Sequence, residues 1–245
     1  MEKVLEVKGL TKLYRNKRGI RDISFDINKG EIFGFLGPNG AGKTTVMKTI
    51  TGLCRGSSGA VKIMGYDIVS EFEKAMESVG CIIETADVYE YMTGYKNLEM
   101  SARFYDGINK SRINEVIDMV GLSKYKDDKA GNYSLGMKQR LGLAGAILSN
   151  PGFIIMDEPN NGIDIEGMVD IRNIVTSLSK ENNTTFFISS HLVHEIETLC
   201  TKAAIICDGC LISEIEISKL EEMGFSSLED FYIKNIKNQR GREDE

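Results

Sequence analysis

One glycine-rich segment, residues 37–44 with the sequence GPNGAGKT, constrains the fold of this 245-residue chain more than any other. It matches the pattern G-x-x-x-x-G-K-[S/T], in which glycines let backbone N–H groups approach phosphate oxygens. The apolar run 31–36 precedes it, and residues 44–53 lack a helix-breaking residue until Gly52. The segment therefore predicts a phosphate-binding loop between a strand and a helix, whose positive end faces the phosphates.

Individual positions of this loop have distinct expected roles. Lys43 is expected to reach the β- and γ-phosphates of a nucleotide, and the Thr44 hydroxyl to bind Mg²⁺. The predicted nucleotide contacts in this segment are Gly37, Asn39, Gly40, Ala41, Gly42, Lys43, Thr44 and Thr45.

Two adjacent carboxylates follow a second apolar run. Residues 153–156 read FIIM and are followed by Asp157 and Glu158. The carboxyl end of a parallel strand lies at the same sheet edge as a phosphate-binding loop. Asp157 is therefore predicted to hold Mg²⁺, and Glu158 to polarise an attacking water.

Composition excludes several classes of protein. The formal charge is −6 and there is no long Lys/Arg run, so binding to nucleic acid through its phosphates is disfavoured. The longest apolar stretches, 141–148 and 203–207, are far shorter than the roughly 20 residues that cross a bilayer. No signal-peptide pattern opens the chain, and the five cysteines form no disulfide framework. These features predict a cytoplasmic location with reduced thiols.

Hydrophobic periodicity predicts one α/β domain over residues 1–245, with a mostly parallel sheet, an N-terminal β part and an inserted helical subdomain at about 92–150. Buried strands are expected at 153–156 and 184–189. Inside the helical block, Ser111 is the expected cap of one helix and Ser134 of another. Cys207-Asp208-Gly209-Cys210 is typical of a two-residue hairpin turn, and a short helical tail is expected at about 216–245.

Further segments resemble motifs of the ATP-binding cassette (ABC) family. Residues 133–140, YSLGMKQR, resemble its signature sequence, usually LSGGQ, in the family's order between the phosphate loop and Asp157. Residues 161–164, NGID, resemble the loop after the second carboxylate, and His191 resembles the switch histidine that contacts the γ-phosphate. Tyr14 lies where the family stacks an aromatic ring on adenine. The resemblance covers residues 4–215, and it implies an α/β fold of the P-loop NTPase type with an N-terminal antiparallel β part.

The resemblance also implies a mechanism. ATP with Mg²⁺ would lie between the phosphate loop of one subunit and Ser134 and Gly136 of the other, in a head-to-tail dimer or paired cassettes. The dipole of the helix behind Ser134 favours this contact with the γ-phosphate. Hydrolysis, with Glu158, His191 and Lys43 as catalytic residues, would open the dimer and drive a separate membrane-spanning permease. Asp164 would take part in dimer contacts and coupling, and the chain would lie at the inner face of the membrane.

The sequence departs from the family pattern in two places. Leu135 and Met137 replace the usual Gly and Gln of the signature, while Ser134 and Gly136 are retained. At the position of the family's Mg²⁺-binding and coupling glutamine stands Glu84, which retains an oxygen ligand but adds negative charge near the phosphates. Residues 83–98 look most similar to ATPases of exporters that confer resistance or immunity to bacitracin and lantibiotics.

Two alternative functions are open on the sequence alone. A soluble cassette protein could act on nucleic acid or ribosomes, although such relatives usually carry two cassettes or coiled-coil insertions, and the acidic balance disfavours it. A regulatory cassette that does not hydrolyse ATP is suggested by the altered signature and by Glu84. Retention of Glu158 and His191 argues against that alternative.

Overall fold

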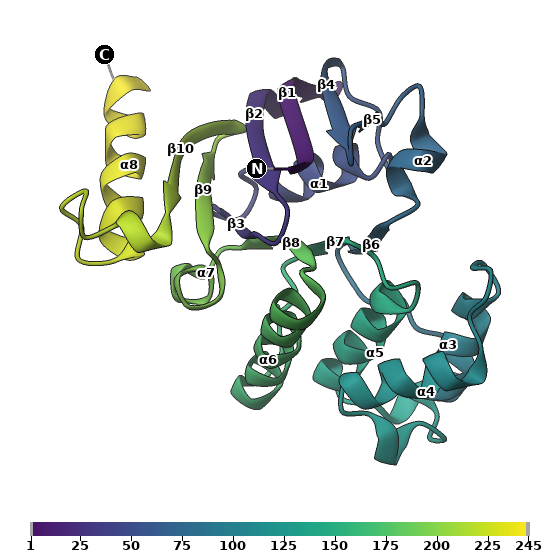
Figure 1. Cartoon of the computed structure of the whole chain (residues 1–245). Helices are drawn as coiled ribbons and strands as arrows, with labels where there is room; N and C mark the ends of the chain where they lie inside the picture. The colour runs from purple at the N-terminus through teal and green to yellow at the C-terminus, as the bar shows by residue number, and fades with distance from the viewer. Residues whose placement is uncertain (1, 244–245) are drawn as a thin grey trace.

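The computed structural model describes residues 2–243, so Met1 and residues 244–245 of the predicted 1–245 unit lie outside the described part. Within it the chain forms two β-sheets and a set of covering helices (Figure 1). The strands are β1 Lys3–Leu13, β2 Gly19–Asn28, β3 Ile32–Leu36, β4 Ser58–Ile63, β5 Tyr66–Asp67, β6 Val79–Ile82, β7 Phe153–Asp157, β8 Thr185–Ser190, β9 Lys202–Cys207 and β10 Cys210–Glu216. The α-helices are α1 Lys43–Ile50, α2 Phe72–Met76, α3 Gly94–Ala102, α4 Lys110–Met119, α5 Leu135–Ile147, α6 Ile165–Asn182, α7 Val193–Leu199 and α8 Leu228–Glu243.

The larger sheet has the strand order β10-β9-β3-β8-β7-β6. Its strands are parallel except for β10, which pairs antiparallel with β9. Strands β3, β7 and β8 are buried along their whole length because both faces of this sheet are covered. The predicted strands at 153–156 and 184–189 are confirmed, as is the turn at Asp208 and Gly209, where Cys207 pairs with Cys210.

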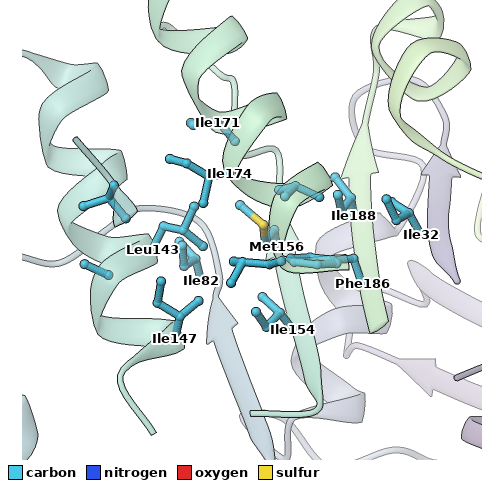
Figure 2. Close-up of a cluster of buried hydrophobic side chains, with 14 of the residues drawn as sticks. Ile32, Ile82, Leu143, Ile147, Ile154, Met156, Ile171, Ile174, Phe186 and Ile188 are labelled. Atoms are coloured by element: carbon cyan, nitrogen blue, oxygen red, sulfur yellow. The ribbon is translucent and has the colours of Figure 1, made fainter. Parts of the chain in front are cut away.

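Alternate residues of each buried strand enter two different cores. On β7, Ile154 and Met156 face the helical side, where Figure 2 shows them among side chains from α5 and α6. Phe153 and Ile155 face the opposite side, toward α1 and the second sheet. Because successive side chains of a strand point to opposite faces, this alternation fixes the face that each residue occupies. The strand is therefore anchored on both sides, and so is the position of the carboxylates at its end.

The second sheet, β2-β1-β4-β5, is antiparallel and confirms the predicted N-terminal β part. It packs on the face of the larger sheet that carries α1 (Figure 1). Phe25 of β2 stacks on Phe33 of β3 with ring centroids 5.3 Å apart, and a T-shaped contact joins Phe33 to Phe187 of β8. Such aromatic pairs add to the stability gained from burial.

Helices α3, α4 and α5 occupy the predicted helical block and lie to one side of the larger sheet, in teal in Figure 1. The expected cap at Ser111 was wrong: α4 begins at Lys110, and the side chain of Asn109 accepts the N–H of Arg112. An asparagine two residues earlier is an equally good cap, and the sequence pattern did not separate the two. The predicted cap of α5 by Ser134 is confirmed, with Oγ accepting the Met137 N–H at 3.2 Å.

The C-terminal segment contains α8, which confirms the expected helical tail as far as Glu243. It contacts α7, where Glu197 Oε1 accepts the Leu228 N–H at 2.9 Å, and its residues Leu228 and Phe231 are buried. Figure 1 shows α8 in yellow next to β10. No helix within residues 2–243 combines the length and apolar character needed to cross a membrane.

Candidate nucleotide-binding and hydrolysis site

The candidate site forms where four neighbouring parallel strands end. The carboxyl end of β3 leads into the glycine-rich loop, β7 ends at Asp157, and His191 directly follows β8. Strand β6, at the sheet edge, is followed two residues later by Glu84. Because β3, β8, β7 and β6 are hydrogen-bonded neighbours, residues far apart in the sequence meet at one sheet edge.

The glycine-rich loop has the backbone that phosphate binding requires. Gly40 and Gly42 have φ angles of 81° and 109°, in the left-handed region that favours glycine, and Gly42 is the residue before α1. A Cβ atom at Gly37 would lie 2.4 Å from the carbonyl oxygen of Ile206, so a side chain does not fit there. The β9–β10 turn supports the loop, since Gly209 N–H donates to the Ala41 carbonyl at 3.0 Å.

A chain of charged contacts joins the loop to Glu158 and His191. Lys43, which is 5% exposed, donates from Nζ to the Gly37 carbonyl at 2.7 Å and lies 3.0 Å from Glu158 Oε1. The other carboxylate oxygen, Glu158 Oε2, is 2.7 Å from His191 Nδ1. The carboxylate thus bridges the two residues predicted to contact the γ-phosphate.

Glu158 has an unusual backbone. Its φ angle of 47° lies in the left-handed region, which a residue with a Cβ atom adopts at an energetic cost. Ser189 fixes this conformation: its Oγ accepts the Glu158 N–H at 2.9 Å and donates to Asp157 Oδ1 at 2.6 Å. Ser189 thereby positions both carboxylates, a role that its place at a strand end did not reveal in the sequence.

The oxygen donors predicted to hold Mg²⁺ fit that ion. Asp157 is 2% exposed and Thr44 lies in the first turn of α1, so both can supply hard oxygen ligands beside the phosphate loop. No group of three or more His, Cys, Asp or Glu side chains gathers as a cation site within residues 2–243. Asp157 and Thr44 match the usual Mg²⁺ site of nucleotide-binding proteins, in which one or two protein oxygens act together with phosphates and water.

A pocket of about 210 Å³ lies against the loop and includes Glu158. Its lining contains most of the predicted phosphate contacts: Asn39, Gly40, Gly42, Lys43, Thr44 and Thr45.

Tyr14, the residue predicted to stack on adenine, does not line this pocket. Tyr14 lies between β1 and β2 and is 44% exposed. The ammonium of Lys12 lies over its ring, 5.4 Å from the ring centre. Part of the ring is therefore free to stack on a flat ligand.

The signature residues lie outside the pocket lined by Lys43. Ser134 is exposed at the start of α5, and an added Cβ at Gly136 would lie 3.8 Å from Gly167 Cα on α6. Asp164 caps α6, with Oδ1 accepting the Gly167 N–H at 2.9 Å. Ser134, Gly136 and Asp164 therefore form a separate exposed surface, as expected if they act on a nucleotide held by a second subunit.

Replacing Ser134 with alanine is expected to destabilise the fold by about 1 kcal/mol, because the N-terminal turn of α5 loses its cap. Thr93→Ala is the matched control, since Thr93 caps α3 through the same kind of bond, 3.2 Å from the Lys96 nitrogen. Thermal melting should show similar losses for both variants. ATP hydrolysis should fall only in Ser134→Ala, and an equal fall in both would show that Ser134 has no role beyond capping.

Comparison with known proteins agrees with this geometry. Residues 20–161 match the family model of the ABC transporter. The chain is 46% identical over 212 residues to the uncharacterized ABC transporter ATP-binding protein YhcH of Bacillus subtilis, covering 86% of this chain and 70% of that protein. It is 42% identical to the bacitracin transport ATP-binding protein BcrA of Enterococcus faecalis, covering 91% and 72% of the two chains.

A lantibiotic transport ATP-binding protein, SrtF of Streptococcus pyogenes, is 33% identical and covers 95% of this chain and 97% of its own. Among solved structures, the ATP-binding subunit of an ABC transporter superposes with a TM-score of 0.83 at 26% identity, covering 95% and 99% of the two chains. Family model, relatives and fold agree with the residues at the sheet edge. This chain belongs to the ABC transporter family, as one of its ATP-binding ATPase subunits.

Proposed function

We propose that residues 1–245 form one ATPase cassette that powers a separate membrane permease, with the site residues in the roles that the sequence predicts. The observation that carries this proposal is the linked set Lys43, Glu158 and His191 beside the phosphate loop. Lys43 and His191 would contact the γ-phosphate, and Glu158 would accept a proton from the attacking water. Thr44, Asp157 and Glu84 would hold Mg²⁺, which neutralises phosphate charge when bound.

The second half of each site would come from another cassette in a head-to-tail dimer. Exposed apolar side chains lie next to the signature surface, with Leu135 50% and Ile165 81% exposed. Apolar residues that flank a capping serine can be buried when two subunits close on ATP. This arrangement supports an ATP-dependent dimer that opens after hydrolysis.

A groove supports docking of the permease at the inner membrane face. It has a volume of about 380 Å³ and lies between the end of β6 and the helical block, with Leu53, Ile83, Tyr89, Tyr105 and Leu141 in its lining. Tyr89 is 51% exposed, yet its backbone is fixed by the buried Asn97, whose amide bonds both its N–H and its carbonyl. A fixed loop that presents exposed aromatic rings is suited to bind an amphipathic helix.

The substrate class follows from the relatives. BcrA is a bacitracin transport protein and SrtF a lantibiotic transport protein, and both align along most of this chain. We infer that the permease exports a peptide antibiotic of this kind, and that the pair confers resistance or immunity.

Affinity purification from detergent-solubilised membranes of the host tests this function. The wild-type chain should recover a protein with several spans of about 20 apolar residues. Tyr89→Asp should reduce that recovery at least about tenfold, since a charge would be buried without a partner. Tyr66→Asp is the control, because Tyr66 is 39% exposed on β5 and outside the groove.

Two results would count against the proposed function. Recovery of only ribosomal or DNA-processing proteins would remove the transport role. Equal recovery by Tyr89→Asp and the wild type would remove the docking surface. Cells that lack the chain and its permease should become sensitive to bacitracin or a lantibiotic, which checks the substrate class.

A further inference from the structure

The carboxylate at position 84 has a partner that the sequence did not indicate. Glu84 Oε1 lies 2.6 Å from Nζ of Lys48, which is on α1. The Glu84 side chain is 60% exposed and that of Lys48 30%. The hydrogen bond that Lys48 donates to Glu84 raises the pKa of Lys48, and the charge of Asp157 makes a smaller contribution. The ammonium of Lys48 therefore interacts electrostatically with Glu84 and Asp157, the two carboxylates predicted to bind Mg²⁺.

The backbone at Glu84 sets this contact. Its φ angle is 70°, in the left-handed region, just after the edge strand β6. Non-glycine residues adopt this conformation at a cost that surrounding contacts must offset. Lys48 lies five residues after Lys43 along the same helix, so the pair connects the edge of the sheet to the helix that begins at the phosphate loop.

The opposite charges of Lys48 and Glu84 affect the electrostatic environment of the nucleotide site. A glutamine at position 84 would be neutral, whereas Glu84 adds one negative charge near Asp157 and near the phosphates that the loop binds. A negative charge near the phosphates weakens nucleotide binding, and the Lys48 ammonium, 2.6 Å from the Glu84 carboxylate, offsets that repulsion. Together, Lys48 and Glu84 carry no net charge, whereas Glu84 without Lys48 would leave one uncompensated negative charge.

We propose that Lys48 and Glu84 act as one charge-balanced unit at the edge of the nucleotide site. Lys48 is a positioning residue: it holds the Glu84 carboxylate and allows a negative side chain beside MgATP. This inference rests on the proposed role of Glu84 next to the bound nucleotide.

Equilibrium binding of a fluorescent, non-hydrolysable ATP analogue in the presence of Mg²⁺ tests the unit without requiring turnover. Lys48→Met should weaken binding about fivefold to tenfold, because Glu84 loses its counter-charge. Glu84→Gln keeps an oxygen ligand for Mg²⁺ but removes a negative charge near the phosphates, so binding should become about twofold tighter. The double variant Lys48→Met with Glu84→Gln should return to within about twofold of the wild type, a non-additive result. Lys48→Arg, which keeps the charge, should stay close to the wild type.

A second ion pair supplies the matched control. Lys3 and Asp26 are 2.7 Å apart and partly exposed, and they lie near the start of β3, whereas the phosphate loop follows its end. Lys3→Met should leave nucleotide binding unchanged. Both ion pairs are partly exposed and add little to folding stability, so the variants should melt near the wild-type temperature.

Each outcome bears on one claim. If the double variant binds as weakly as Lys48→Met, or if Lys48→Met binds like the wild type, the charge-balanced unit is refuted while the ATPase function stands. If the wild type does not bind the analogue with Mg²⁺, the proposed function fails, and this inference fails with it.

Discussion

Replacing Glu158 with glutamine is expected to lower steady-state ATP hydrolysis by at least about 100-fold, the usual effect of removing a general base. A glutamine amide cannot take a proton from the attacking water. ATP binding should persist or become tighter, since the carboxylate lies 3.0 Å from Lys43 and competes with the γ-phosphate for that ammonium. Phosphate release and binding of a fluorescent ATP analogue measure the two effects separately.

The control for this variant is Glu181→Gln, near the end of α6 farthest from the site, where the side chain is exposed. It should hydrolyse ATP at the wild-type rate. Turnover of Glu158→Gln within about threefold of the wild type would exclude Glu158 as the general base. A different group would then have to activate the water.

Lys43→Met is expected to weaken MgATP binding about 10- to 100-fold, as for loss of a charge-assisted hydrogen bond. Lys43 is almost fully buried beneath the loop, where its ammonium is held by two carbonyl oxygens and Glu158. Methionine fills a similar volume without charge and leaves the Glu158 carboxylate facing the phosphates. Titration with the fluorescent analogue measures the loss, and Lys124→Met, on the exposed surface of the helical block, should show none.

A double variant separates the two causes of that loss. Adding Glu158→Gln to Lys43→Met removes the carboxylate that has lost the Lys43 counter-charge, so nucleotide binding should recover in part. Full recovery would mean that Lys43 serves mainly to neutralise Glu158. No recovery would assign the whole effect to the contact between Lys43 and the phosphates.

Among the carboxylate residues with left-handed backbone, Glu84 and Glu158 follow the neighbouring strands β6 and β7. Each is ion-paired with a lysine of α1, Glu84 with Lys48 and Glu158 with Lys43. Helix α1 is therefore connected to two neighbouring strand ends through these ion pairs.

The sequence by itself determined the elements and their order. The glycine pattern at 37–44 predicted the strand, loop and helix, and the apolar run before Asp157 predicted a buried strand that ends in carboxylates. The sequence also predicted the capping serine of α5 and the turn between Cys207 and Cys210. Such features depend on residues close together in the chain, whose conformational preferences are local.

Only the tertiary structure decided which side chains meet. Three sets of contacts join segments that are more than thirty residues apart in the sequence. Ser189 donates a hydrogen bond to Asp157, Glu158 contacts both Lys43 and His191, and Lys48 pairs with Glu84. Their contacts depend on the strand order β3-β8-β7-β6 and on two left-handed backbone angles, neither of which is encoded by a local pattern. Asn109 in place of Ser111 as the cap of α4 shows the same limit at short range. Local conformational preference allowed either Asn109 or Ser111 to cap α4, and in the folded chain Asn109 is the cap.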